Sequence, residues 1–180
     1  MNITVYLGAN HGNNPGFVPA VRELGRWIGE SGNALVYGGS RVGLMGELAM
    51  SALAAGAHVT GVEPEFFMTE ELQLDEVDEL IVTQTMAERR AKMIELGDAF
   101  VAFPGGVGTL EEVAEVMSML SLDHLDAPCV FYNLDGFYDL LRAHLDQVVD
   151  AGLCTPYRLR NVHFVDSLDE LAAVLGEKSA

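Results

Sequence analysis

The stretch that decides the fold reads Ala102-Phe103-Pro104-Gly105-Gly106-Val107-Gly108-Thr109-Leu110-Glu111-Glu112. An apolar run over residues 98–103 leads into it and predicts a buried strand, and an amphipathic run over 110–122 follows and predicts a helix. A strand that ends in closely spaced glycines and leads into a helix forms a pocket of backbone N–H groups. Because the helix dipole adds partial positive charge there, the stretch predicts a site for a phosphate or carboxylate.

Two interpretations of Glu112 are open from the sequence. Thr109 can cap the predicted helix, with Glu112 three residues further on as its capping-box partner. Helical spacing also places Glu112 on the apolar face that carries Val116 and Met119. A carboxylate on such a face is costly unless it is paired or used. We therefore expect Glu112 to do more than cap the helix.

Composition limits the class of protein. The 180 residues, 49% of them hydrophobic, suit one domain over 1–180, and no apolar run approaches the roughly 18 residues of a membrane span. A formal net charge of −17 argues against a surface for nucleic acid or anionic membrane, because either needs a basic patch. The chain begins with a strand pattern over residues 2–7, so we expect no signal peptide.

Cysteine and histidine usage points to a reducing compartment and no metal. Cys129 and Cys154 provide neither a disulfide framework nor a metal-ligand spacing, and the five histidines show no ligand spacing either. We therefore expect a cytoplasmic protein without a metal site.

Strand and helix patterns alternate along the chain. Strands are predicted at 2–7, 34–37, 57–62, 80–83, 98–103, 129–132 and 162–165, and helices at 17–30, from the turn 38–46 to 55, and at 85–96, 110–122, 137–149 and 168–175. The segment 65–79 is acidic and irregular. This alternation predicts a Rossmann-like α/β fold, with a parallel sheet covered by helices on both faces. Ligands of such sheets bind beyond the carboxyl ends of the strands, near a switch in strand order.

A second glycine-rich turn follows the strand predicted at 34–37. It reads Gly38-Gly39-Ser40-Arg41-Val42-Gly43-Leu44-Met45-Gly46 and also opens a helix. Because both glycine loops follow strand carboxyl ends, we expect them to line one crevice for a phosphorylated ligand. Neither is a standard nucleotide fingerprint: the chain has no Walker sequence, and Glu111 stands where the dinucleotide pattern has its third glycine.

Three of the ten cations, Arg89, Arg90 and Lys92, lie within four positions. Arg89 falls between Met93 and Leu96 on the apolar side of the predicted helix. Arg90 lies at the other edge of that side, and Lys92 faces away from it. Snorkelling or a structural ion pair would explain Arg89. We favour the alternative, a guanidinium directed at the crevice, where its planar fork suits phosphate.

Together these motifs resemble the LOG ("lonely guy") family of cytokinin riboside 5′-monophosphate phosphoribohydrolases, often labelled lysine decarboxylases. The family pattern P-G-G-x-G-T-x-x-E is complete over 104–112. Its G-G-G-x-x-G-L-M-G appears over 38–46 with Ser40 in place of a glycine, and its M-x-x-R-K appears over 86–90 with Arg90 in place of the lysine. The similarity covers nearly the whole chain. It implies hydrolysis of the N-glycosidic bond of an adenosine 5′-monophosphate to free base and ribose 5-phosphate, with no cofactor.

The resemblance also implies site residues. Arg89 and Glu112 match the family's catalytic arginine and glutamate. The implied nucleotide-binding positions are Gly105, Gly106, Val107, Gly108, Thr109, Leu110, Glu111 and Arg90, to which the other loop adds Gly38, Gly39 and Ser40. Glu71 matches a further binding glutamate.

The family is dimeric or larger, so a homodimer or larger homo-oligomer is expected, and the expected ligand is AMP or an N6-prenylated AMP. The early loop Leu7-Gly8-Ala9-Asn10 lacks two hydroxyls usual in the family, and Ala87 stands where a histidine is common. These departures bear on the substrate preference and leave the reaction class unchanged.

Two rival functions follow from the same residues. A pyridoxal-phosphate lysine decarboxylase needs a buried lysine, and the chain has only Lys92, on a polar face, and Lys178, near its end. The other rival is a non-catalytic carrier or sensor of a phosphorylated nucleotide or pterin, like the molybdenum-cofactor carrier proteins. We favour the enzyme, because a carboxylate at Glu112 suits the oxocarbenium-like ribose that forms when a glycosidic bond breaks.

Overall fold

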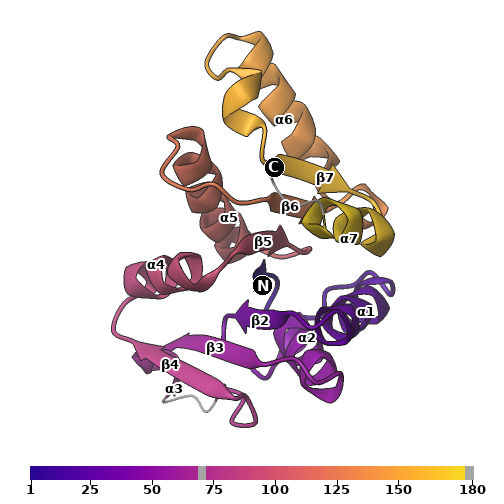
Figure 1. Cartoon of the computed structure of the whole chain (residues 1–180), viewed down its shortest axis with the longest axis vertical. Helices are drawn as coiled ribbons and strands as arrows, with labels where there is room; N and C mark the ends of the chain where they lie inside the picture. Colours follow the sequence, from indigo (N-terminus) through magenta and orange to yellow (C-terminus); the bar gives the residue numbers. More distant parts are fainter. Residues whose placement is uncertain (69–71, 177–180) are drawn as a thin grey trace.

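A parallel sheet forms the centre of the computed structural model, which describes residues 1–68 and 72–176. Within that part the sheet has seven strands in the order β4-β3-β2-β1-β5-β6-β7, and every adjacent pair is parallel (Figure 1). The strands are β1 (Asn2–Tyr6), β2 (Ala34–Tyr37), β3 (Val59–Pro64), β4 (Glu79–Thr83), β5 (Ala99–Ala102), β6 (Cys129–Tyr132) and β7 (Val162–Val165). The predicted Rossmann-like α/β fold is confirmed.

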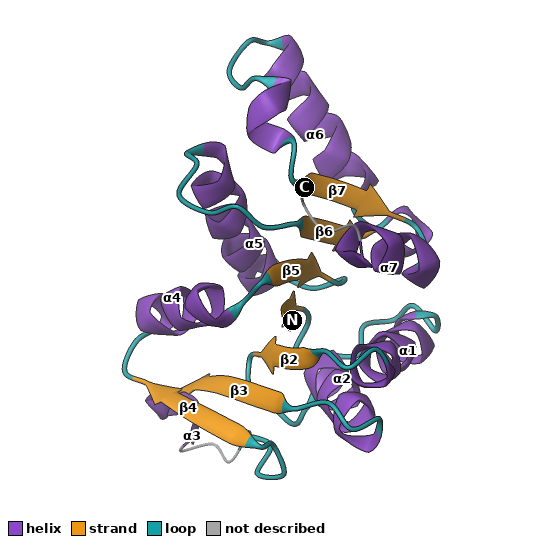
Figure 2. Cartoon of the chain, viewed as in Figure 1, coloured by secondary structure: helices purple, strands orange, loops and turns teal. Residues whose placement is uncertain are grey.

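Helices cover both faces of this sheet. They are α1 (Phe17–Glu30), α2 (Gly43–Ala54), α3 (Glu65–Met68), α4 (Met86–Leu96), α5 (Val107–Ser121), α6 (Asp139–Asp150) and α7 (Leu168–Gly176), with 3-10 turns η1 (Leu134–Gly136) and η2 (Pro156–Leu159). Helices α1, α2 and α7 lie on one face, and α4, α5 and α6 on the other (Figure 2).

The central strands are buried on both faces. On β1, Val5 belongs to the core that α1 and α2 complete, whereas Tyr6 belongs to the core that α4 and α5 complete. On β5, Val101 belongs to the core beside α1 and α2, and Phe100 belongs to the core beside α4 and α5. Because successive side chains of a strand point to opposite faces, a strand covered on both faces needs apolar residues at nearly every position. This requirement explains why these strands read as continuous apolar runs in the sequence.

The strand order reverses between β1 and β5. From β1 the chain builds β2, β3 and β4 outwards on one side, and it then returns to place β5 on the other side of β1. The loops that leave the carboxyl ends of β1 and β5 therefore diverge, which opens a crevice between them. The loop at residues 103–106 lies at this point, whereas the loop that follows β2 lies one strand away.

The capping box predicted at Thr109 and Glu112 is wrong. Helix α5 begins at Val107 and has Gly106 as its N-cap, with no side-chain capping bond. The helix starts earlier than the amphipathic pattern indicates, so Thr109 lies inside its first turn, where its hydroxyl cannot act as an N-cap. Side-chain capping occurs instead at α4, where Thr85 Oγ1 accepts a hydrogen bond from the Glu88 backbone N–H.

Candidate active site

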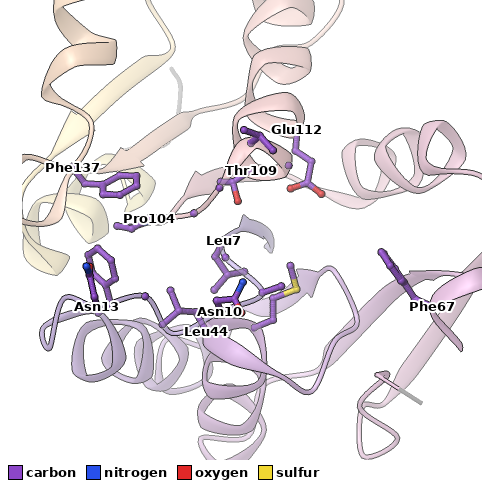
Figure 3. A pocket seen from close by; sticks show the side chains of 18 of the residues that line it. Leu7, Asn10, Asn13, Leu44, Phe67, Pro104, Thr109, Glu112 and Phe137 are labelled. Carbon is purple, nitrogen blue, oxygen red and sulfur yellow. The ribbon is translucent and has the colours of Figure 1, made fainter. Parts of the chain in front are cut away.

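A cavity of about 560 Å³ lies at the carboxyl ends of β1 and β5, at the switch in strand order (Figure 3). The loop after β1 and the start of α2 form one wall, and the loop after β5 with the first turns of α5 forms the wall opposite. Met86 and Arg89 of α4, Phe67 of α3 and Phe137 complete the lining. The site expected from the sequence thus corresponds to an open cavity of ligand size.

The structure brings together part of the predicted site. The predicted residues that line the cavity are Arg89, Gly105, Gly106, Val107, Gly108, Thr109 and Glu112. The predicted residues that do not line it are Gly38, Gly39, Ser40, Arg90, Leu110 and Glu111. Glu71 lies outside the described residues.

Arg89 and Glu112 form a buried ion pair at the cavity wall. The distance from Nη1 of Arg89 to Oε1 of Glu112 is 2.5 Å, and each residue is 5% exposed. Arg89 also donates from Nε to the Val62 carbonyl at 2.9 Å and from Nη2 to the Gly38 carbonyl at 3.4 Å. These bonds use three of the five guanidinium N–H groups. Arg89 is therefore held at the cavity wall, most firmly through Nη1 and Nε and more loosely through Nη2.

The carboxyl of Glu112 points into the cavity. Figure 3 shows it directed from α5 towards the space that Leu7 and Asn10 border on the other side. Among the described residues, its Oε2 atom receives no hydrogen bond. Burial raises the pKa of Glu112 above its ordinary value, and Arg89 opposes that rise. A partly desolvated carboxylate with one free oxygen is suited to accept a proton or to face a developing positive charge.

The loop after β5 offers backbone N–H groups to a ligand. A Cβ atom on Gly106 or on Gly108 would meet nothing within 4 Å, so both glycines face open space. A Cβ on Gly105 would lie 2.1 Å from Oγ1 of Thr109, so this glycine lets the loop close onto the helix. The first N–H groups of α5 have no partner within the helix. Their position agrees with the anion site predicted for this stretch, which stays a prediction.

The loop after β2 has the opposite surroundings. A Cβ on Gly38 would lie 2.2 Å from Nη2 of Arg89, and a Cβ on Gly39, whose φ is +84°, would lie 2.4 Å from Oε2 of Glu63. Ser40 is buried, and its Oγ accepts a hydrogen bond from the backbone N–H two residues on. The space left by these glycines is occupied by charged side chains of the protein itself. This loop thus acts on the cavity through Arg89.

Arg90 binds the adjacent helix beside the cavity. Its Nη1 lies 2.9 Å from Oε1 of Glu111, and its Nε lies 2.6 Å from Oε2 of Glu115. Both carboxylates are on α5, so these ion pairs hold α4 against α5. Since the same two helices carry Arg89 and Glu112, the Arg90 contacts support the geometry of the buried pair.

Several lining residues were not predicted as site residues. They are Leu7, Gly8, Ala9, Asn10, Gly12, Asn13, Phe17, Leu44, Met45, Phe67, Met86, Pro104 and Phe137. Met45, Met86 and Pro104 lie inside the quoted motifs, so their position there could have identified them as site residues. Phe67 lies in a segment interpreted as irregular, and Phe137 lies far along the chain, where its ring meets Phe17 edge-on at 5.9 Å. For Phe137 the sequence carried no signal.

The described residues show neither a metal-binding cluster, nor a membrane-spanning helix, nor a lysine that lines the cavity. They contain no group of three or more side chains able to hold a metal ion, and none of their helices is long and apolar enough to cross a membrane. Lys92 forms an ion pair with Glu95 at 2.7 Å on the outer side of α4. Lys178 lies outside the described residues. Lys92 does not line the cavity.

Solved structures share this fold. The molybdenum cofactor carrier protein of Chlamydomonas reinhardtii is 24% identical and superposes with a TM-score of 0.74 over 98% of this chain and 96% of that one. The molybdenum cofactor binding protein of Rippkaea orientalis is 23% identical, with a TM-score of 0.70 over 97% of this chain and 94% of that one. At these identities the likeness shows the fold alone.

Sequence relatives identify the family. A family model described as "possible lysine decarboxylase" matches residues 45–175. A cytokinin riboside 5′-monophosphate phosphoribohydrolase of Arabidopsis thaliana is 36% identical over 97% of this chain and 81% of its own length. The enzyme of that name from Rhodococcoides fascians is 42% identical over 86% of this chain and 79% of its own length. With its motifs, its fold and these relatives in agreement, the chain belongs to the LOG family.

Proposed function

We propose that the protein is a phosphoribohydrolase that cleaves the N-glycosidic bond of AMP or an N6-prenylated AMP, giving free base and ribose 5-phosphate. The observation that carries this proposal is the buried Arg89–Glu112 pair, which lies in the same cavity as the open N–H groups of residues 106–109. The names of the sequence relatives support the same reaction. Residues 1–180 would carry it out as one domain, without a cofactor.

The phosphate is the part of the substrate that the glycine loop binds. The N–H groups at the start of α5 and the dipole of that helix favour an anion with no side chain in the way. Binding the phosphate away from the reacting bond positions the ribose, so binding energy is converted into orientation at the anomeric carbon.

Glu112 acts at the anomeric carbon. As the bond between the base and C1′ breaks, its electron pair leaves with the base, which takes up a proton from solvent, and positive charge develops on the ribose. The Oε2 atom of Glu112 faces that charge and accepts the proton of the attacking water, while Oε1 stays bound to Arg89. The proton that Glu112 accepts from the attacking water later returns to solvent, which balances the reaction. Arg89 fixes the carboxylate and presents its remaining N–H groups to the substrate.

Base release is the decisive test. Purified protein is incubated with AMP and with isopentenyl-AMP, and the free base is measured by chromatography against a Glu112→Gln control. Release from either substrate, lost in the variant, supports the phosphoribohydrolase, and the ratio of the two rates defines the substrate. Nucleotide binding without any base release would contradict the proposal and favour a carrier of a phosphorylated nucleotide or pterin.

Assembly and compartment form the remaining part of the proposal. We infer a homodimer or larger homo-oligomer in the cytoplasm. Val107 and Leu110 are apolar and exposed next to the cavity, at 88% and 47%, which suits coverage by a second copy. Cys129 and Cys154 are both free thiols. Light scattering after size exclusion measures the assembly, and a monomeric mass would contradict it.

A further inference from the structure

Glu63 is a second buried carboxyl near the site, and the mechanism above gives it no role. It lies on β3 and is 2% exposed. Within the described residues its Oε2 atom has no hydrogen-bond partner. An ionised carboxylate in such a place is costly, because neither water nor a hydrogen-bond donor compensates its charge. Such a residue is a candidate for a function that depends on its proton.

The turn Gly38-Gly39 brings Glu63 close to Arg89. Nη2 of Arg89 occupies the space that a Cβ on Gly38 would need, and Oε2 of Glu63 occupies the space that a Cβ on Gly39 would need, so both side chains pack against adjacent residues of one turn. Nη2 is also the loosely held nitrogen of Arg89, since its bond to the Gly38 carbonyl is 3.4 Å long whereas Nη1 lies 2.5 Å from Glu112. The guanidinium thus has one strong carboxylate partner, and it lies close enough to a second carboxyl, that of Glu63, for its charge to act on it.

The groups packed around Glu63 leave Arg89 as its electrostatic partner among the described residues. Burial raises the pKa of Glu63 to about 7, and the positive charge of Arg89 opposes that rise. From β2, Tyr37 faces it as a neutral phenol, whose own pKa is raised by burial and by the Glu63 charge. On β4 its register partner is the apolar Val82. The protonation state of Glu63 therefore changes the field that acts on Arg89.

We propose that Glu63 is a positioning residue for Arg89: protonated, it leaves the guanidinium to Glu112 and the substrate phosphate, and ionised, it draws the guanidinium back towards β3. Only one proton is exchanged, between the Glu63 carboxyl and solvent. The inference rests on the proposed function for the identity of the anion. Its consequence is that affinity for AMP falls as the pH rises through the ionisation of Glu63.

The test compares Glu63→Gln with the wild type from pH 5.5 to 9. The dissociation constant of AMP is measured by calorimetry and base release by chromatography at each pH. Between pH 6 and 8.5 the wild type should lose about tenfold more affinity than Glu63→Gln, as expected for a coupling of about one pKa unit, and KM should carry the change rather than kcat. The phosphate titrates near pH 6 in every variant, so its contribution cancels in the comparison.

Glu79→Gln is the matched control. Glu79 is exposed on β4, opposite Thr60 of β3, and its loss removes the same charge without affecting Arg89. This variant should follow the wild-type profile. Glu63→Leu, which is also neutral, should follow Glu63→Gln. A profile of Glu63→Gln identical to that of the wild type would overturn the proposal.

A measurement on the wild type keeps the proposal open to refutation if the variants fail to fold. By linkage, AMP must raise the pH at which Glu63 ionises by about one unit, which carbon-13 NMR of labelled glutamate carboxyls detects. An unchanged titration would overturn the proposal. If AMP binding shifts the ionisation of Glu63 but no base is released, the role of Glu63 stands and the proposed function fails. If base is released but the ionisation of Glu63 does not shift, the proposed function stands and the role of Glu63 fails. Failure of the wild type to bind either AMP or isopentenyl-AMP would overturn both.

Discussion

The two glycine-rich loops have the same plan in the sequence and opposite surroundings in the structure. Each follows a parallel strand and opens a helix, from β2 into α2 and from β5 into α5. Gly106 and Gly108 face open space in the loop after β5 and line the cavity. Gly38 and Gly39 in the loop after β2 are packed against Arg89 and Glu63.

A glycine, which has no side chain, can leave room either for a ligand or for another part of the same protein. Position in the sheet decides between the two. The loop after β5 lies at the reversal of strand order, where neighbouring loops diverge, whereas β2 lies between β1 and β3, and α4 can reach over its end. The loop after β2 therefore anchors the catalytic candidate Arg89, and the loop after β5 is left open to the cavity.

The largest expected effect tests whether the open loop serves catalysis or binding alone. Glu112→Gln should lower base release about 1000-fold, because the amide can neither accept a proton nor oppose a developing positive charge. AMP binding should change little, since the amide oxygen still accepts from Arg89, whereas the buried Arg89 charge loses its counter-charge, which should lower the free energy of unfolding. Base release and calorimetry measure the two properties separately. Turnover equal to that of the wild type would refute the role of Glu112.

The next effect tests the occupied loop. Gly38→Ala places a methyl group 2.2 Å from Nη2 of Arg89, so the end of this side chain must shift and its bond to Glu112 weakens. Weakening a buried ion pair in this way should lower the free energy of unfolding by about 1–3 kcal/mol, which urea denaturation measures. Gly106→Ala is the control from the open loop, where the change should stay within about 0.5 kcal/mol. Equal effects at both glycines would remove the distinction between the loops.

A smaller effect is expected from pH. The pKa of Glu63 is about 7 in the folded protein and 4.5 without burial, so between these values the unfolded chain releases its proton first. The free energy of unfolding should therefore fall by about 3 kcal/mol as the pH rises from 4.5 to 7, and it should level off above 7. Denaturation of Glu63→Gln should lack this decrease. If the free energies of unfolding of the wild type and Glu63→Gln differed by the same amount at every pH, Glu63 would not be buried and protonated as described.

The smallest effect separates stability from binding within the open loop. Gly108→Ala lies in the first turn of α5 and should raise the free energy of unfolding by about 0.5–1 kcal/mol, because alanine favours the helix over glycine. Its methyl group would enter open space at the cavity wall and should weaken AMP binding. Thermal unfolding and calorimetry test both expectations. Unchanged affinity would show that this part of the loop does not contact the nucleotide.

The fold was predictable because its signals are local. Strands buried on both faces must be continuous apolar runs, such as residues 98–103, and the turns between elements need glycine. The positions of Arg89 and Glu112 on the apolar sides of their helices also follow from the helical period alone. The cap at Thr109 failed for a local reason too: helix α5 begins at Val107, and the start of a helix is the feature that pattern defines least sharply.

Local patterns in the sequence were enough to predict the α/β architecture, the glycine-rich loop after β5 and the two charged residues on apolar helix faces. Only the tertiary structure decided that Arg89 binds Glu112, that Phe137 borders the cavity, and that Glu63 shares a turn with Arg89. The physical reason is the range of the interactions. Periodicity and turn chemistry act over a few residues, whereas these contacts join segments that meet only after the strands have taken their order in the sheet.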